Sequence, residues 1–134
     1  SLAAAAHESL VEIRNGHMGV GAGSVWHRDG LVVTNAHVAS GRDLTVTLSD
    51  GRELPARLLA RNKHLDLAAL AVDEIGLPAM TIGDSRRLQP GQILLAAGHP
   101  WGVLGAVTAG VFIGHESSRG QGGRGREWLV RTFD

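Results

Sequence analysis

The feature that most limits how this chain can fold is a series of short segments of alternating polarity, joined by turns that contain glycine. Residues 44–48 alternate strictly between an aliphatic residue and threonine, which is the period of a strand with one buried face. Asp50-Gly51 follows as a typical hairpin turn, and residues 53–60 predict the returning strand. The chain contains 19 glycines but only 4% aromatic residues, so many tight turns are expected. This pattern predicts an all-β fold, a barrel or a sandwich.

Other segments are also predicted to be strands, and they share an apolar or β-branched composition. They lie at 9–13, 19–25, 31–36, 65–72, 93–97, 106–113 and 128–133. A short helix is expected before the first of them. The segment 65–72 is apolar except at Asp66, which predicts a strand buried on both faces with one carboxylate inside it. Turn residues concentrate at 76–91, which predicts a connection between two sheets.

Charge and composition exclude several classes of function. The chain has 13 basic and 13 acidic residues, so it offers no basic face to nucleic acid or anionic lipid. Its apolar runs fall far short of the roughly 20 residues of a membrane helix. It has no cysteine, and its seven histidines lack the close spacing of zinc ligands. We therefore expect no nucleic-acid partner, no membrane contact by this segment, no metal and no cofactor.

His37 and Asp66 are the candidate catalytic residues. A buried carboxylate that accepts a hydrogen bond from one imidazole nitrogen fixes the tautomer of the ring and stabilises its protonated form. The other nitrogen is then free to take a proton from a nucleophile. Either residue alone is a weak indication, because a single histidine near a strand end is more often a packed or hydrogen-bonded residue.

A set of short motifs occurs in a fixed order between residues 19 and 114. They are GAGSV at 21–25 followed by DG at 29–30, VTNAHV at 33–38, VTLSDGRE at 46–53, DLAAL at 66–70, IGDS at 82–85, and GHPWG at 98–102 leading into VTAG at 107–110. Through these motifs the chain resembles the trypsin-like serine proteases, and specifically their HtrA/Deg branch. The resemblance implies that His37 is the general base and Asp66 the acid that orients it. It also implies two six-stranded antiparallel barrels with the active site in the cleft between them.

The resemblance also divides the chain. Residues 1–18 would form an entry helix and strand, 19–75 the complete first barrel, 76–91 the inter-barrel connection, and 92–134 the first half of the second barrel. In this family the nucleophilic serine lies in a Gly-x-Ser-Gly-Gly motif further along the second barrel, and the sequence ends before it. We therefore expect this polypeptide by itself to be inactive, because covalent catalysis requires that serine.

Three serines within the chain are weaker candidates for the nucleophile. Ser85 is followed by two arginines where an oxyanion loop needs the space of glycines. Ser117 and Ser118 lie in the segment 114–127, which is predicted to be a polar loop without a strand to hold them near His37. That loop could be a regulatory element by resemblance or an RGG-like nucleic-acid arm. A mobile surface loop is favoured, because no aromatic residues separate its arginines.

Two functions follow from these observations. The leading hypothesis is a serine endopeptidase domain that hydrolyses exposed or unfolded polypeptide bound as an added strand. The alternative is a non-catalytic protease-fold module that binds a peptide or a partner, with His37 and Asp66 as a structural pair. Family membership further implies a cell-envelope, periplasmic or secreted setting, a possible homotrimer and a downstream PDZ domain.

Overall fold

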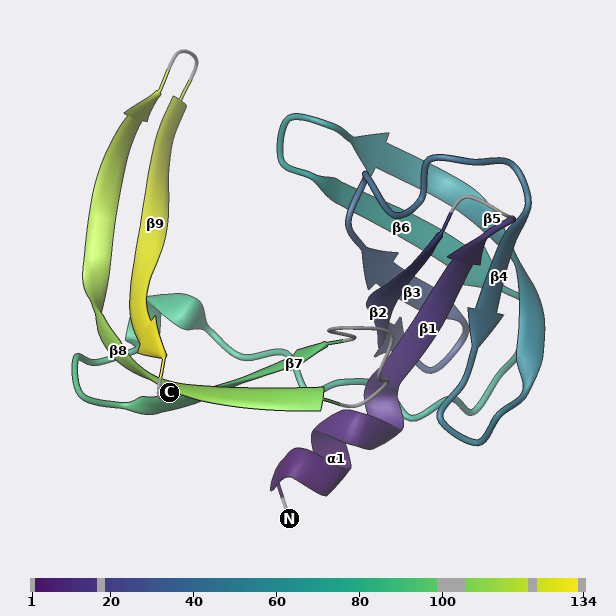
Figure 1. The fold of residues 1–134 in the computed structure, drawn as a ribbon, viewed down its shortest axis with the longest axis horizontal. Helices are drawn as coiled ribbons and strands as arrows, with labels where there is room; N and C mark the ends of the chain where they lie inside the picture. Colours follow the sequence, from purple (N-terminus) through teal and green to yellow (C-terminus); the bar gives the residue numbers. More distant parts are fainter. Residues whose placement is uncertain (1, 17–18, 99–105, 121–122, 133–134) are drawn as a thin grey trace. The chain divides into compact units, whose positions relative to one another are not determined.

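The computed structural model describes residues 2–16, 19–98, 106–120 and 123–132, and most of its regular secondary structure is β-strand (Figure 1). The motif residues 99–102 lie outside the described residues. The elements are α1 (Leu2–Ser9), β1 (Leu10–Asn15), β2 (Val20–His27), β3 (Leu31–Thr34), β4 (Leu44–Thr47), β5 (Glu53–Asn62), β6 (Leu67–Val72), the 3₁₀ helix η1 (Ser85–Arg87), β7 (Ile93–Gly98), β8 (Ala106–Gly120) and β9 (Gly123–Thr132). Over the described residues no helix is long and apolar enough to cross a membrane.

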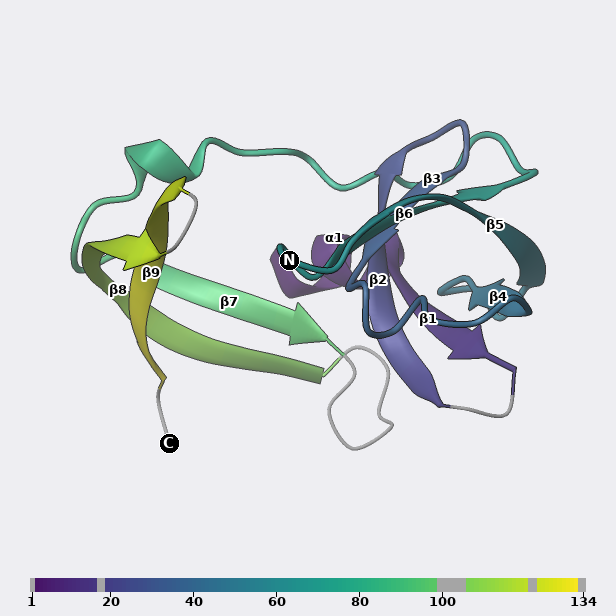
Figure 2. The ribbon, with the colours of Figure 1, turned by 90° about the horizontal axis from the view of Figure 1, so that it is seen from above.

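Six strands close into one barrel in the order β1-β2-β3-β6-β5-β4, and each neighbouring pair is antiparallel. Figure 2 shows these strands as a ring. The remaining strands, β7, β8 and β9, form a separate three-stranded sheet. The prediction of an all-β fold with one complete barrel and one partial second sheet is thereby confirmed. β1 is one of the six barrel strands, and it lies in the segment 1–18 that was expected to form an entry helix and strand.

Aliphatic side chains from all six strands fill the barrel. The fully or almost fully buried members of this core are Val11, Ile13, Val25, Val32, Ala39, Leu44, Val46, Leu48, Ala68, Leu70, Val72 and Leu77. Residues 44, 46 and 48 are among them, which confirms the alternation predicted for that strand. Burying one large aliphatic side chain contributes about 1.5–3 kcal/mol, so this cluster is the main source of the barrel's stability.

Strand β5 departs from its predicted pattern. Leu54 and Ala56 pack against the core as expected, but Leu58 is exposed. From Arg57 onward every residue of β5 is exposed, and the pairing of β5 with β6 shifts register between Leu58 and Ala60. Pro55 was expected at an edge or bulge. It lies just beyond the ladder with β6, which begins at Ala56, so its missing N–H leaves no gap in that ladder.

The predicted burial of residues 65–72 on both faces is wrong. Strand β6 begins only at Leu67, and Leu65 is 63% exposed. Within the strand, buried and less buried residues alternate, as in a strand with a single core face. The reason is the closed barrel: its wall has one inner face, which takes every second side chain, and the other side chains point outward.

The described residues form two compact units, Ser1–Ile82 with Ala97–Ala106, and Gly83–Ala96 with Val107–Asp134. In the second unit β8 and β9 pair from Gly110 opposite Thr132 to Gly120 opposite Gly123. The predicted polar loop at 114–127 is therefore wrong, because most of it is a long hairpin. Backbone N–H and C=O groups pair across such a ladder whatever the side chains are, so a low strand propensity does not prevent it.

Candidate active site

His37 lies in a turn that directly follows strand β3. The backbone N–H groups of Val38 and Ala39 both donate to the carbonyl oxygen of Asn35, at 3.1 and 3.2 Å, and these bonds close the turn. Just before it, the Thr34 hydroxyl donates to the Ala22 carbonyl oxygen at 2.7 Å, which ties the end of β3 to β2. The His37 side chain is 71% exposed, so this turn presents the imidazole outside the barrel core.

Asp66 lies in the turn between β5 and β6. The N–H of Leu65 donates to Asn62 Oδ1 at 3.0 Å, and the N–H of Asp66 points to the Lys63 carbonyl oxygen at 3.4 Å. Asp66 has a φ of 53°, and it is the one non-glycine residue of the described chain with a positive φ. Aspartate tolerates this left-handed conformation better than most residues, which suits it to the last position of the turn.

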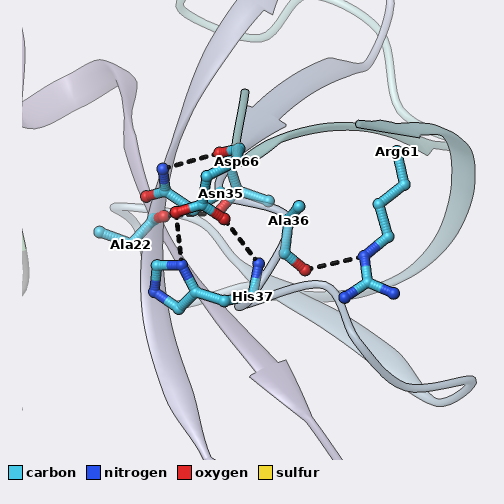
Figure 3. A network of polar contacts seen from close by, with 7 residues as sticks. Ala22, Asn35, Ala36, His37, Arg61 and Asp66 are labelled. Carbon is cyan, nitrogen blue, oxygen red and sulfur yellow. Dashed lines mark hydrogen bonds and ion pairs between the residues drawn. The ribbon is translucent and has the colours of Figure 1, made fainter. Parts of the chain in front are cut away.

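The two residues meet because β3 and β6 are antiparallel neighbours. In that ladder Thr34 lies opposite Ala68, so the turn after β3 lies beside the turn before β6. His37 Nδ1 and Asp66 Oδ2 are 2.7 Å apart, and the backbone N–H of His37 donates to Asp66 Oδ1 at 2.9 Å (Figure 3). Each carboxylate oxygen therefore has a partner on the same histidine.

These bonds determine the charge of Asp66 and the tautomer of His37. The backbone N–H of His37 is the main reason that the pKa of Asp66 is lowered, and the imidazole adds to it, while partial burial opposes the shift. Asp66 therefore stays ionised and acts only as an acceptor. The neutral imidazole donates from Nδ1, so its lone pair lies on Nε2, the nitrogen that a general base uses.

The expectation that the carboxylate is buried is wrong for the described barrel. The Asp66 side chain is 44% exposed. Its position explains the difference, because it precedes the first residue of β6 and lies at the end of the barrel wall rather than inside it. The amide and imidazole hydrogen bonds therefore keep the carboxylate ionised, because they outweigh the partial desolvation, which favours the protonated acid.

Comparison with known proteins decides the family. Residues 21–132 match the model of the trypsin-like peptidase domain. This chain belongs to the trypsin-like peptidase family. The match covers most of the chain, including both turns that carry the His37–Asp66 pair. The family resemblance predicted from the motifs is thereby confirmed.

Similar proteins include serine proteases of the HtrA/DegP type. A probable periplasmic serine endoprotease DegP-like of Halomonas elongata is 44% identical over 93 residues, which are 69% of this chain and 20% of the relative. The putative serine protease HhoB of Synechocystis is 40% identical over 103 residues, which are 75% of this chain and 25% of HhoB. The solved HtrA-type protease AlgW with tripeptide has a TM-score of 0.79 at 34% identity, covering 90% of this chain and 40% of AlgW. The chain thus spans about a quarter or less of these two curated relatives.

The three serines considered as nucleophiles lie elsewhere in the fold. Ser85 begins the 3₁₀ helix η1, and Asp84 caps that helix by accepting from the Arg86 N–H at 3.0 Å. Ser117 and Ser118 lie in strand β8, where their backbone pairs with β9. Among the described residues, His37 Nε2 has no hydrogen-bond partner, and no serine hydroxyl bonds the ring.

A second histidine–aspartate pair shows what distinguishes the first. His27 Nδ1 and Asp29 Oδ2 are 3.6 Å apart, and the backbone N–H of Asp29 donates to the same Nδ1 at 3.1 Å. Whenever the ring is neutral, Nδ1 accepts this bond, so Nε2 carries the proton and has no lone pair for a base. The described residues contain no group of three histidine or acidic side chains that could hold a metal ion.

Two residues that sequence analysis did not single out also contact the site. Asn35 Nδ2 donates to the Asp66 carbonyl oxygen at 3.0 Å, and Arg61 Nε donates to the Ala36 carbonyl oxygen at 2.9 Å (Figure 3). Asn35 had a usable signal, because it directly follows strand β3 and lies two positions before His37. Arg61 had no such signal. It lies near the end of β5, far from Ala36 in the sequence, and only the pairing of the barrel strands brings it to the turn that carries His37.

Proposed function

We propose that this chain is part of an HtrA-type serine endopeptidase domain in which His37 is the general base and Asp66 orients it. The observation that carries the proposal is the pair of hydrogen bonds from His37 to the two oxygens of Asp66. These bonds leave Nε2 with a lone pair and without a partner among the described residues.

In this mechanism the nucleophilic serine and the oxyanion donors come from outside the described residues. His37 Nε2 takes the proton of the serine hydroxyl while the serine oxygen attacks the carbonyl carbon of the peptide bond. The imidazolium that forms is stabilised by the ionised Asp66, and it then gives its proton to the leaving amine. Water, deprotonated in the same way, releases the acyl group and regenerates the serine.

The substrate, setting and assembly rest on the relatives. AlgW is described with a tripeptide in one structure and a decapeptide in another, which supports an exposed or unfolded polypeptide as substrate here. Such a segment would bind as an added strand. The periplasmic naming of the Halomonas relative supports a cell-envelope setting. A homotrimer and a downstream PDZ domain belong to the same proposal, and size-exclusion chromatography of the full-length gene product tests the trimer.

The test uses the full-length gene product and an unfolded protein substrate. We expect His37→Ala to abolish hydrolysis and Asp66→Asn to lower kcat about 10⁴-fold, because the amide favours the wrong tautomer. His27→Ala is the matched control, since it removes an exposed histidine that also has an aspartate neighbour. It should leave hydrolysis unchanged. Full hydrolysis by His37→Ala would reject the mechanism.

The same material tests the alternative of a non-catalytic binding module. A fluorophosphonate probe labels an activated serine, and the proposal requires labelling that disappears in His37→Ala. A full-length product that binds a labelled unfolded peptide, but neither hydrolyses it nor reacts with the probe, would establish the binding module instead.

A further inference from the structure

We infer that Asn35 is a positioning residue, whose side-chain amide holds Asp66 in the backbone conformation that presents its carboxylate to His37. The inference rests on the proposed function, because it concerns the same His37–Asp66 pair. It assigns to Asn35 no contact with substrate. Its role is to fix the geometry of the residue that orients the base.

The backbone of Asp66 needs an external constraint. Its φ of 53° lies in the left-handed region, which disfavours residues with a side chain. Within the local turn the bond made by Asp66 itself, from its N–H to the Lys63 carbonyl oxygen, is 3.4 Å long and restrains this residue only weakly. Asn35 Nδ2 donates to the carbonyl oxygen of Asp66 at 3.0 Å and so restrains the peptide unit that follows this strained residue.

Three donors from one short turn hold Asp66 at three separate atoms. Asn35 Nδ2 binds the backbone oxygen, the His37 N–H binds Oδ1, and His37 Nδ1 lies 2.7 Å from Oδ2 (Figure 3). The carboxylate is contacted by His37 and, more weakly, by the backbone N–H of Ala36 in the same turn. None of these contacts restrains the carbonyl end of Asp66, so without Asn35 the peptide unit after Asp66 could turn and move Nε2 away from the position where a serine must meet it.

Asn35 also shapes the turn that carries His37. Its carbonyl oxygen accepts the N–H groups of Val38 and Ala39. One residue therefore fixes the histidine turn through its backbone and the aspartate turn through its side chain. Its side chain is exposed, so replacing it opens no cavity in the barrel core.

The chemistry requires a donor at this position. An aspartate in place of Asn35 would bring a charged acceptor against the carbonyl oxygen of Asp66, and a leucine would have a similar size without any donor. Loss of one net hydrogen bond that acts in the transition state corresponds to a fall in kcat of about tenfold. We therefore expect Asn35→Leu to lower kcat about tenfold with KM unchanged, and Asn35→Asp to lower it at least as much.

The test measures kcat and KM of the full-length gene product for Asn35→Leu, Asn35→Asp and Asn62→Leu. Asn62 is the matched control, because its side chain accepts from the Leu65 N–H in the Asp66 turn without touching Asp66. We expect Asn62→Leu to affect kcat less than Asn35→Leu. Wild-type kcat in Asn35→Leu, a change in KM alone, or an equal effect of Asn62→Leu would overturn the inference.

A spectroscopic measurement separates positioning from general stability. The proton on His37 Nδ1 should give a low-field NMR resonance in the 134-residue chain, and Asn35→Leu should shift or broaden it while the barrel core resonances stay in place. An unchanged resonance contradicts the inference. Failure of the proposed function is distinguishable from failure of this inference. It appears as hydrolysis that survives His37→Ala, independently of the effect of the Asn35 variants.

Discussion

Gly30 joins β2 to β3 at a point where the barrel wall leaves no space for a side chain. Its φ is +105°, and its carbonyl oxygen accepts the Val72 N–H at 2.9 Å, which links the turn to the end of β6. A Cβ on Gly30 would overlap the carbonyl oxygen of Val72 and lie 3.2 Å from that of Glu74. Both obstacles are backbone atoms, so no side-chain rotation can relieve the overlap.

Gly30→Ala should therefore destabilise the barrel through two separate effects. Holding alanine at a positive φ costs about 1–2 kcal/mol. Moving the end of β6 away from the new methyl group costs about 1–3 kcal/mol more, and the bond between Gly30 and Val72 is lost or weakened as well. We expect the free energy of unfolding to fall by about 4 kcal/mol, a large part of the 5–15 kcal/mol that is usual for a small domain.

Gly51→Ala is the matched control. Gly51 also lies in a turn at a positive φ, +91°, but a Cβ there would have no heavy atom within 4 Å. Gly51→Ala should lower the free energy of unfolding only by the cost of holding alanine at a positive φ, about 1–2 kcal/mol. Urea unfolding followed by far-UV circular dichroism measures both variants, and we expect the midpoint to fall at least twice as far for Gly30→Ala. Equal midpoints would refute the argument that the close approach to Val72 matters.

Two further predictions concern the site. In Gly21→Ala a Cβ would lie 2.6 Å from both methyl groups of Val38, the residue after His37, so hydrolysis by the full-length product should fall by about tenfold or more while the barrel stays folded by circular dichroism. The pKa of Asp66 is lowered from 3.8 in the folded state, so its contribution to stability is present above pH 3.8 and is lost as the pH falls through the lower folded value. Asp66→Asn should therefore lose less stability than the wild type between pH 5 and pH 2 in acid titrations followed by circular dichroism.

Local signals in the sequence were sufficient to predict part of the fold. The alternation at 44–48 and the Asp50-Gly51 turn predict β4, β5 and the hairpin between them, because a period of two and a positive φ are properties of adjacent residues. Features that depend on distant pairing were not predictable. The register shift in β5 and the pairing of β8 with β9 through the glycine- and arginine-rich segment arise between strands, and no local composition encodes them.

The contact between His37 and Asp66 also could not be predicted from local sequence. His37 and Asp66 are 29 positions apart, and their contact depends on the register in which β3 and β6 pair. That register is fixed by Val32 opposite Leu70, both fully buried in the barrel core. A slip of β6 by one residue would turn Leu70 outward and move the two turns about 3.3 Å past each other, too far for the hydrogen bonds between them. The hydrophobic core, which makes no contact with substrate in the proposed mechanism, thus determines the distance between the base and the acid that orients it.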